Sequence, residues 1–410
     1  MRPSRFPLGV AALALLMGTG AAAPPSFKVT DPPAGPGAMA PNLGLDTHSG
    51  RGLLLTWLEP RDPKAPERGH RLRFSRFTEG RWSAPATIAE GTDFFANWAD
   101  FPAVAVGPKG GLAASWLAKS PGGGTYDYAI QLARSADGGR TWRAAGVLHS
   151  DGTPAEHGFV SWISEPAGLR AFWLDGREMP NGGAMTVRTA GIEAGAKEEV
   201  VDSRVCECCQ TDAAVAADGP VVVYRNRSDK TPGGQEIRDI YIARRTAAGW
   251  STPAPVHADN WEITGCPVNG PAVAAQGRDV AVAWFTAAQG RPRVQLAFSR
   301  DGGAHFGEPV EIDAGRPLGR VDVALTGIGK EGPEAVVSWL AVKEGGAAVH
   351  LRRAGPRGLG APVTVAATGA GRSSGFPRLA RYGDDFAVAW VEDGETSRVR
   401  FAIVPAAAVP

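Results

Sequence analysis

The stretch Val280-Ala281-Val282-Ala283-Trp284 decides how the rest of this chain is understood. Small and β-branched apolar residues that end in an aromatic side chain are typical of a buried β-strand. The pattern recurs at residues 53–57, 112–116, 169–173, 221–224, 335–339 and 386–390. Its aromatic positions are separated by 59, 57, 51, 60, 55 and 51 residues. A repeat of this length in a strand-rich sequence is typical of a β-propeller, in which each repeat builds one blade.

The residues on either side of the quoted stretch complete a four-stranded repeat. An apolar run at residues 271–275 precedes it, and an alternating run at residues 294–298 follows it. A fourth strand is expected to begin at residues 306–309, where an aromatic residue is followed by glycine and then by proline. Period-2 alternation between Gly and Pro clusters indicates strands. The other copies follow the same order.

The repeat predicts one large ring rather than several domains. Seven copies are present, and the seventh ends after its third strand, near residue 404. A lone strand-like run at residues 26–30 precedes the first copy. We expect this run to pair as the outer strand of the last blade, because that closes the ring and leaves no open sheet edge. The prediction is an all-β fold with a single seven-bladed propeller over residues 24–410. Six blades is the alternative if the weak third copy is not a blade.

The first residues have the organisation of a signal peptide. Arg2 and Arg5 precede an apolar run at residues 8–17, and small residues follow at 18–23. The apolar run is too short to span a bilayer, and the small residues are what a signal peptidase requires. We therefore expect residues 1–23 to be removed from an exported protein, periplasmic or secreted, without a membrane span. Much Ala, Gly, Arg and Pro with little Lys is typical of a high-GC bacterial genome.

The overall charge argues against nucleic acid as a partner. The chain has 43 Lys and Arg against 42 Asp and Glu, whereas phosphate binding requires a basic field or patch. We expect a monomer whose partner is a small molecule or a glycan.

Two turns between third and fourth strands share one motif. The first reads Ser-Ala-Asp-Gly-Gly-Arg-Thr-Trp at residues 135–142, and the second reads Ser-Arg-Asp-Gly-Gly-Ala-His-Phe at residues 299–306. The aspartate can accept backbone N–H bonds across the turn, and glycine supplies the positive φ. The motif positions are Ser135, Asp137, Gly139, Trp142, Ser299, Asp301, Gly303 and Phe306. They resemble the Asp-box of the sialidase-like (BNR-repeat) β-propellers.

The resemblance implies a fold and, less directly, an activity. In that family the Asp-boxes stabilise the fold on the face opposite the active site, so we expect a structural role for these residues. Sialidases are glycoside hydrolases that use an arginine triad, an Asp acid/base and a Tyr nucleophile assisted by a Glu. Residues 38–42, where an Arg-Ile-Pro motif would lead into the first blade, contain no arginine, and no tyrosine falls in a late connecting loop. A hydrolase and a non-catalytic recognition or scaffold propeller therefore both stay open.

The candidate site lies in the loops that enter each blade and in the loops between second and third strands, because propellers gather both on one face. We call this the loop face. Its arginines and one tryptophan could bind an anionic or sugar-like ligand; these are Arg177, Arg225, Arg227, Arg238, Arg320, Arg378 and Trp261. Candidate carboxylates for acid/base catalysis are Asp175, Glu178, Asp239 and Glu262. The alternative is that these charged groups pair with one another and bridge neighbouring blades. The third to fifth copies have the richest loops, so we expect a site displaced toward them.

The chain has four cysteines, Cys206, Cys208, Cys209 and Cys266, in equivalent loops that lead into the fourth and fifth blades. An even number in an exported chain favours disulfides, here from Cys266 to Cys206 or Cys209. A second interpretation is a thiolate site for Zn or Cu(I). A third is a redox-active thiol whose pKa is lowered by Arg204. The sequence leaves all three open.

Overall fold

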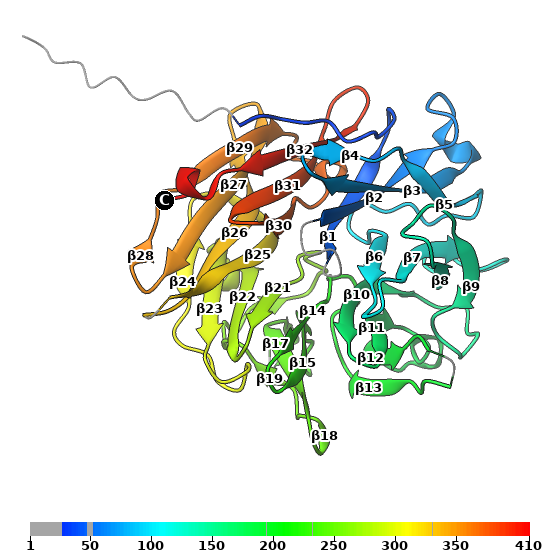
Figure 1. Ribbon diagram of the computed structural model, residues 1–410. Helices are drawn as coiled ribbons and strands as arrows, with labels where there is room; N and C mark the ends of the chain where they lie inside the picture. Colours follow the sequence, from blue (N-terminus) through cyan, green and yellow to red (C-terminus); the bar gives the residue numbers. More distant parts are fainter. Residues whose placement is uncertain (1–26, 47–51, 194, 232, 330) are drawn as a thin grey trace, which may run out of the picture.

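The computed structural model describes residues 27–46, 52–193, 195–231, 233–329 and 331–410. Seven antiparallel blades form a ring around a central channel (Figure 1). The predicted seven-bladed propeller is confirmed, and the six-bladed alternative is wrong because the weak third copy forms a complete four-stranded sheet. The expected signal peptide lies outside the described residues. Within those residues, no helix is long and apolar enough to cross a membrane.

In each blade the first strand lies at the channel, and the later strands follow in chain order toward the outside. Blades 1 and 2 contain β1 Met39–Asp46, β2 Gly52–Pro60, β3 His70–Thr78, β4 Arg81–Trp82, β5 Ala86–Gly91, β6 Ala103–Val106, β7 Leu112–Lys119, β8 Tyr128–Ser135 and β9 Arg143–Val147. Blades 3 and 4 contain β10 His157–Glu165, β11 Gly168–Asp175, β12 Thr186–Gly191, β13 Glu199–Asp202, β14 Asp212–Ala216, β15 Gly219–Arg225, β17 Ile240–Thr246, β18 Gly249–Trp250 and β19 Ala254–Pro255.

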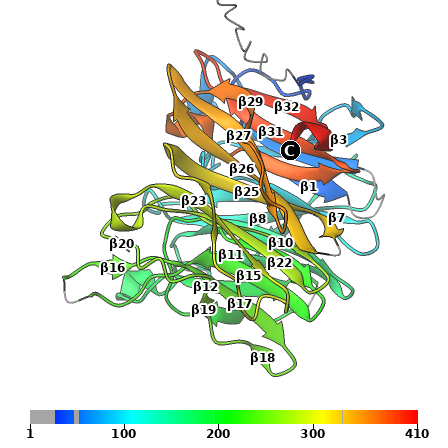
Figure 2. The same cartoon turned by 90° about the vertical axis from the view of Figure 1, so that its left-hand side faces the viewer.

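The remaining three blades continue the ring. They contain β21 Ala272–Gln276, β22 Asp279–Thr286, β23 Arg293–Ser299, β24 Val310–Asp313, β25 Pro317–Gly329, β26 Gly332–Lys343, β27 Gly346–Gly355, β28 Gly358–Leu359, β29 Val363–Thr368, β30 Arg378–Tyr382, β31 Asp385–Glu392 and β32 Arg398–Val404. A two-stranded ribbon, β16 Glu236–Ile237 with β20 Glu262–Ile263, stands on the loop face (Figure 2). Short 3-10 turns are η1 Pro66–Arg68, η2 Met179–Asn181, η3 Ala288–Gly290, η4 Arg372–Ser374 and η5 Ala406–Ala408.

The repeated aromatic residue has the same role in five blades. Its ring is buried between sheets, and its N–H or O–H donates to a carboxylate, because a buried indole or phenol needs a partner for its polar atom. The donor–acceptor distances lie between 2.7 and 3.0 Å for Trp57–Glu59, Trp173–Asp175, Tyr224–Asp202, Trp284–Asp259 and Trp339–Asp313. The aromatic end of each of these strands is thus part of the core, and the carboxylate that accepts its hydrogen bond is structural.

The inner strands are joined across blade boundaries by aspartates. Asp212 accepts a 2.7 Å bond from the backbone N–H of Val273, and Asp322 accepts a 2.9 Å bond from that of Leu379. Asp100 does the same for Phe159. These bonds satisfy backbone groups that the gaps between blades would otherwise leave unpaired.

The ring closes between blades 7 and 1 as expected. Val29 pairs antiparallel with Ala402 of β32, and the N–H of Thr30 donates to the carbonyl of Phe401 at 2.9 Å. Phe401 also packs against Phe77 and Trp82 of blade 1, with ring centroids 5.0 and 4.9 Å apart. The start of the chain therefore supplies the outer edge that the seventh copy lacks.

The two Asp-box turns form the hydrogen bonds that their residues suggest. The Asp137 carboxylate accepts the N–H of Thr141 at 2.9 Å, and the N–H of Gly139 donates to the Ser135 hydroxyl. Asp301 accepts the corresponding N–H of His305 at 2.9 Å. Both turns join third to fourth strands, so they lie on the face opposite the loop face.

Candidate functional site

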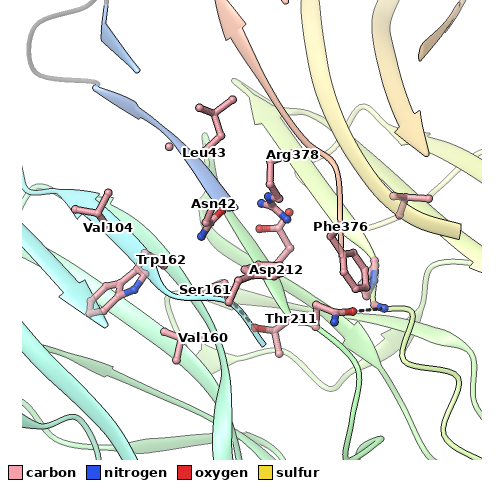
Figure 3. A pocket seen from close by; sticks show the side chains of 17 residues that line it. Asn42, Leu43, Val104, Val160, Ser161, Trp162, Thr211, Asp212, Phe376 and Arg378 are labelled. Atoms are coloured by element: carbon pink, nitrogen blue, oxygen red, sulfur yellow. Dashed lines mark hydrogen bonds between the residues drawn. The ribbon is translucent and has the colours of Figure 1, made fainter. Parts of the chain in front are cut away.

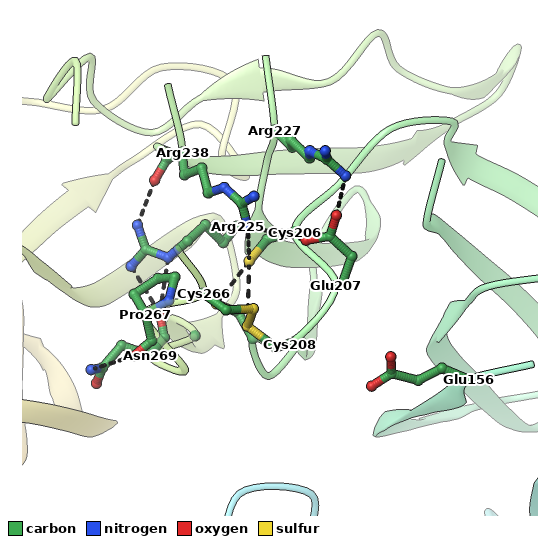
Figure 4. The surroundings of a disulfide bond; sticks show 12 residues. Glu156, Cys206, Glu207, Cys208, Arg225, Arg227, Arg238, Cys266, Pro267 and Asn269 are labelled. Carbon is green, nitrogen blue, oxygen red and sulfur yellow. Dashed lines mark hydrogen bonds and ion pairs between the residues drawn. A yellow bond between two sulfur atoms is a disulfide. The ribbon is translucent and has the colours of Figure 1, made fainter. Parts of the chain in front are cut away.

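The cysteine loop enters blade 4 and is fixed by its own backbone. The N–H of Val205 donates to the carbonyl of Met185, and that of Cys206 donates to the carbonyl of Arg225, each at 3.0 Å. Gln210 then reaches across the boundary, because its side-chain oxygen accepts the N–H of Gly270 in the next loop. The loops that enter blades 4 and 5 are therefore held side by side (Figure 4).

A disulfide joins these two loops, as the even cysteine count favours, but it pairs Cys208 with Cys266. The expected partners of Cys266, Cys206 or Cys209, are wrong. Both of those side chains turn into the interior, where each is 1% exposed. Cys208 is half-buried and faces the neighbouring loop, whereas Cys266 is exposed.

Cys206 and Cys209 are free thiols whose sulfurs are 3.1 Å apart. Burial alone would raise the pKa of Cys206, but hydrogen bonds from Cys209 and from the Cys208 backbone, together with Arg238 and Arg225, lower it to about 6. Burial and the neighbouring thiolate raise the pKa of Cys209 well above its usual range. Cys206 is therefore the more acidic of the two thiols.

The group that contacts the thiolate is Arg238, whose Nη1 lies 3.3 Å from the sulfur of Cys206. Arg204, which the sequence suggested, instead pairs with Asp229 and Glu236. With Cys208 in the disulfide, the two free cysteines have the spacing Cys-x-x-Cys, which the run of three cysteines hid.

Five of the six candidate arginines are committed to the protein itself. Arg225 is 1% exposed and donates to the carbonyls of Asn269, Arg238 and Phe285, with its guanidinium over the ring of Trp261. Trp261 is itself buried beneath it. These contacts join blades 4 and 5, so Arg225 and Trp261 are structural.

The other four arginines form ion pairs or bind backbone carbonyls. Arg227 and Arg238 both contact Glu207 and Glu236. Arg177 pairs with Asp175 and Glu198 at 2.7 and 2.8 Å, and Arg320 binds the carbonyls of Gly371 and Gly375. Only Arg320 bridges neighbouring blades, from blade 6 to the loop that enters blade 7; the ion pairs of Arg177, Arg227 and Arg238 lie within one blade and its loops. All four are occupied by the protein itself.

The four candidate carboxylates are not brought together. Asp175 is fully buried, accepts from Trp173 and Arg177, and has a lowered pKa because these bonds outweigh its burial. Asp239 is buried and accepts the N–H groups of Asn260 and Trp261. Glu178 and Glu262 are exposed. In the described ranges, no residue donates a hydrogen bond to more than one of Asp175, Glu178, Asp239 and Glu262.

One titratable pair on the loop face was not among the candidates. The hydroxyl of Tyr128, at the start of β8, donates to Glu156 at 2.7 Å. Burial and the nearby charges of Glu207 and Cys206 raise the pKa of Glu156 to about 7, against the effect of the tyrosine bond. The two residues are 28 positions apart, and no local pattern in the sequence links them.

The mouth of the channel holds a cavity of about 180 Å³ (Figure 3). It shares lining residues with a second cavity of about 560 Å³ farther along the channel. All seven inner strands or the loops before them contribute to the wall of the first cavity, so this cavity is central and not displaced toward blades 3 to 5. Asp212 and Arg378 line both cavities. Gln210 and Thr211, directly after the cysteines, line the mouth.

The electrostatics of this cavity centre on Arg378. Its guanidinium lies over the ring of Phe101, 4.9 Å from the centroid, and its Nε is 3.3 Å from Asp322. Burial and the charge of Asp322 raise the pKa of Asp212 to about 7, although Arg378 acts in the opposite direction. Within the described part of the chain, neither Nη group of Arg378 donates a hydrogen bond.

Among the described residues, three groups of side chains could hold a metal ion, and two of them share Cys206: Cys206 with Cys208 and Cys209, and Cys206 with Glu207 and Cys266. The sulfurs of Cys206, Cys208 and Cys209 lie within 4.8 Å of one another, and so do ligand atoms of His149, Asp151 and His157. In the histidine cluster the imidazoles stack with centroids 3.6 Å apart, and Arg177 contacts Asp151 at 3.3 Å. Because a guanidinium already neutralises that carboxylate, the histidine cluster is poorly suited to a cation.

No protein-family model and no curated protein sequence matches the chain. Among solved structures, an ulvan lyase of polysaccharide lyase family 25 has a TM-score of 0.59 at 12% identity, covering 93% of this chain and 100% of that one. A Fusarium graminearum GH93 α-L-arabinofuranosidase has a TM-score of 0.49 at 14% identity, covering 94% and 97%. The NanB sialidase of Streptococcus pneumoniae has a TM-score of 0.49 at 10% identity, covering 91% and 69%. The similarity to the lyase is one of fold, and the propeller that the Asp-box resemblance implies is thereby confirmed.

Proposed function

We propose that this protein is exported and binds a glycan or another anionic ligand at the loop face, in the mouth of the central channel. The observation that carries the proposal is Arg378. Arg378 is also in an ion pair, through its Nε with Asp322, but it lines the cavity and neither of its Nη groups donates a hydrogen bond in the described structure. The other five candidate arginines use Nη groups in ion pairs or on backbone carbonyls. A guanidinium with two parallel donors binds a carboxylate or sulfate in a bidentate manner.

The surroundings of Arg378 suit a sugar acid. Phe101 and Phe376 supply apolar surface, and Gln210 and Thr211 supply polar groups at the same mouth. Ligand sites commonly combine apolar walls with a few polar groups that fix orientation. A solved structure with this fold carries the name of an ulvan lyase and was determined bound to -[GlcA(1-4)Rha3S]-, which supports an acidic saccharide as the ligand class.

We assign no proton-transfer role to Asp212 and Asp322, because both carboxylates accept backbone N–H bonds that join blades. A carboxylate so constrained positions a ligand more readily than it takes part in proton transfer.

Hydrolysis is a second candidate, and Glu156 favours it. A carboxyl group whose pKa is about 7 can act as a general acid near neutral pH. In the described structure Glu156 is not among the residues that line the channel cavity, so a substrate would have to extend from the mouth toward blades 2 and 3.

The test is a binding measurement with oligosaccharides that contain uronate, sialate or sulfate, alongside neutral oligosaccharides of equal length. Wild type should prefer the acidic set, Arg378→Ala should lose that preference, and Arg378→Lys should retain part of it. Arg71→Ala, which removes an exposed pairing with Glu90, is the matched control and should bind like wild type. Equal binding by Arg378→Ala and wild type would refute the proposed site.

The hydrolase candidate is tested on the same panel by product analysis. Turnover by wild type that is lost in Glu156→Gln, with binding retained, would assign Glu156 as the acid/base. Turnover that persists unchanged in Glu156→Gln would eliminate it.

A further inference from the structure

The four cysteine sulfurs lie in one cluster but in two chemical states. Cys208 and Cys266 form a disulfide, and Cys206 and Cys209 form a dithiol. The sulfur of Cys206 is 3.1 Å from that of Cys209 and 3.9 Å from that of Cys208. Both distances are close to van der Waals contact, roughly 3.5–4.0 Å between heavy atoms. We propose that this cluster is a thiol–disulfide relay, in which the buried dithiol passes two electrons through the Cys208–Cys266 bond to an external disulfide.

The two free thiols have the asymmetry that exchange requires. The thiolate is the nucleophile in thiol–disulfide exchange, and its partner thiol resolves the mixed disulfide. Here the first cysteine of the Cys-x-x-Cys pair receives a hydrogen bond from Arg238 at 3.3 Å, which stabilises the thiolate. The lowered pKa of Cys206 and the raised pKa of Cys209 agree with this division.

Burial explains why a second pair of cysteines is needed. Cys206 and Cys209 are each 1% exposed, so an external disulfide cannot reach either sulfur. Cys208 is half-buried beside Cys206, and Cys266 is exposed in the neighbouring loop. The sulfurs therefore form a path of increasing exposure from the interior to the loop face.

The exchange conserves atoms and electrons. In the first step the Cys206 thiolate attacks the Cys208 sulfur, the Cys206–Cys208 bond forms, and the Cys208–Cys266 bond breaks. Its electron pair leaves on Cys266, which takes a proton from water. In the second step Cys209 loses its proton and attacks Cys206. The Cys206–Cys209 bond forms, and Cys208 leaves as a thiolate that takes the proton which Cys209 lost.

The result is a Cys206–Cys209 disulfide and a dithiol of Cys208 and Cys266 at the surface. That dithiol reduces an external disulfide by a further exchange, which restores the Cys208–Cys266 bond and releases two thiols. The external partner is thus defined by its chemistry, as a disulfide of a protein or a small molecule.

A thiolate metal site is the competing use of the same sulfurs. Soft thiolates bind Cu(I) and Zn, but Arg238 and Arg225 add positive charge beside Cys206. With Cys208 and Cys266 bonded to each other, two thiol ligands remain. The charge and the ligand number favour the relay, and metal capture is an outcome of the test.

The experiment uses the full-length protein and glutathione disulfide as the probe. Alkylation of denatured samples and peptide mapping report which cysteines are free, and released glutathione reports the rate. We expect the Cys206–Cys209 bond to form while Cys208–Cys266 is retained, with two glutathione molecules released per protein. Cys266→Ser should slow oxidation of Cys206 and Cys209 at least ~10-fold, because the exposed sulfur is gone and only the half-buried Cys208 can meet the probe. Thr264→Ala, an exposed substitution two residues from Cys266, should react like wild type.

Cys209→Ser is a second, independent test that does not remove the disulfide. It blocks the second step, so peptide mapping should find a Cys206–Cys208 bond and a Cys266 that carries glutathione. The relay is wrong if Cys206 and Cys209 oxidise as fast in Cys266→Ser as in wild type, if wild type stays a dithiol in excess probe, or if Cys209→Ser gives no Cys206–Cys208 bond. Stoichiometric, tight binding of Cu(I) or Zn that blocks alkylation of wild type would also overturn it.

Discussion

Neighbouring blades are held together by different kinds of contact at two boundaries. One lies between blades 7 and 1, and the other lies between blades 4 and 5. The first is held by an N-terminal strand and by aromatic packing of Phe401 on Phe77 and Trp82. The second is held by a disulfide and by Arg225, which donates to carbonyls on both sides. Apolar packing is sufficient where the ring only has to close. Charged and covalent contacts occur where the loop face carries its thiols.

The largest effect is expected at the closing boundary. Phe401 is fully buried, so Phe401→Ala removes a large side chain and leaves a cavity, which costs about 4 kcal/mol in the free energy of unfolding. Urea denaturation followed by tryptophan fluorescence measures it. Leu359→Ala on the exposed β28 is the control, and an equal loss in both variants would show that aromatic packing does not hold this boundary.

The boundary between blades 4 and 5 should respond to Arg225→Met by about 3 kcal/mol. The methionine fills most of the space, but three buried carbonyl oxygens lose their donors. Arg227→Met, which removes a half-exposed ion pair, should cost far less. The same urea titration compares the two, and a smaller loss for Arg225→Met than for Arg227→Met would contradict the structural role of Arg225.

Removing the disulfide should lower the free energy of unfolding somewhat less than Arg225→Met does. Cys266→Ser opens a disulfide that spans 58 residues, and the loss is roughly 2–3 kcal/mol because the unfolded chain regains entropy. Thermal unfolding with and without reductant measures it. Reductant should lower the midpoint of wild type and leave that of Cys266→Ser unchanged.

The pH dependence of stability tests the raised pKa of one carboxyl group on the loop face. The pKa of Glu156 is raised to about 7, so the folded state holds this proton more tightly than the unfolded state does. Its contribution is complete below the ordinary glutamate pKa and is lost as the pH rises through about 7. Between pH 5 and 8, the free energy of unfolding of Glu156→Gln should therefore fall by about 1–2 kcal/mol less than that of wild type. Unfolding midpoints at several pH values test this, and parallel curves for wild type and variant would refute the shift.

The smallest effect belongs to the opposite face. Asp137→Ala removes the acceptor of the Thr141 N–H in an exposed turn, and it should lower the free energy of unfolding less than any of the substitutions above, because water can replace an exposed partner. Asp301→Ala should cost a similar amount, because its turn has the same bonds. Neither variant should alter binding of acidic saccharides. A loss of binding in either variant would indicate that the ligand binds on the Asp-box face, which would contradict the proposed site on the loop face.

The features that the sequence predicts are local in the chain, whereas those that it does not predict join residues that are far apart. The blade count follows from the aromatic strand ends because strand pattern is local and repeats with the chain. The Asp-box bonds are local too, within residues 135–142. The loop-face contacts are not local: Arg225 donates to Phe285, 60 residues away, and Tyr128 donates to Glu156. Which arginine stays available, and which cysteine meets Cys266, depend on how two loops from different blades approach each other.

The pairing of Val29 with Ala402 has a consequence for the time course of synthesis. The two residues are 373 positions apart, and at 5–20 residues per second the first strand is made roughly 20–75 s before its partner. Until then the outer edge of blade 7 does not exist, and the first strand has no sheet to join. The ring can therefore lock only after the last copy is complete. A chain that stalls even one strand early presents open edges that invite pairing with other chains.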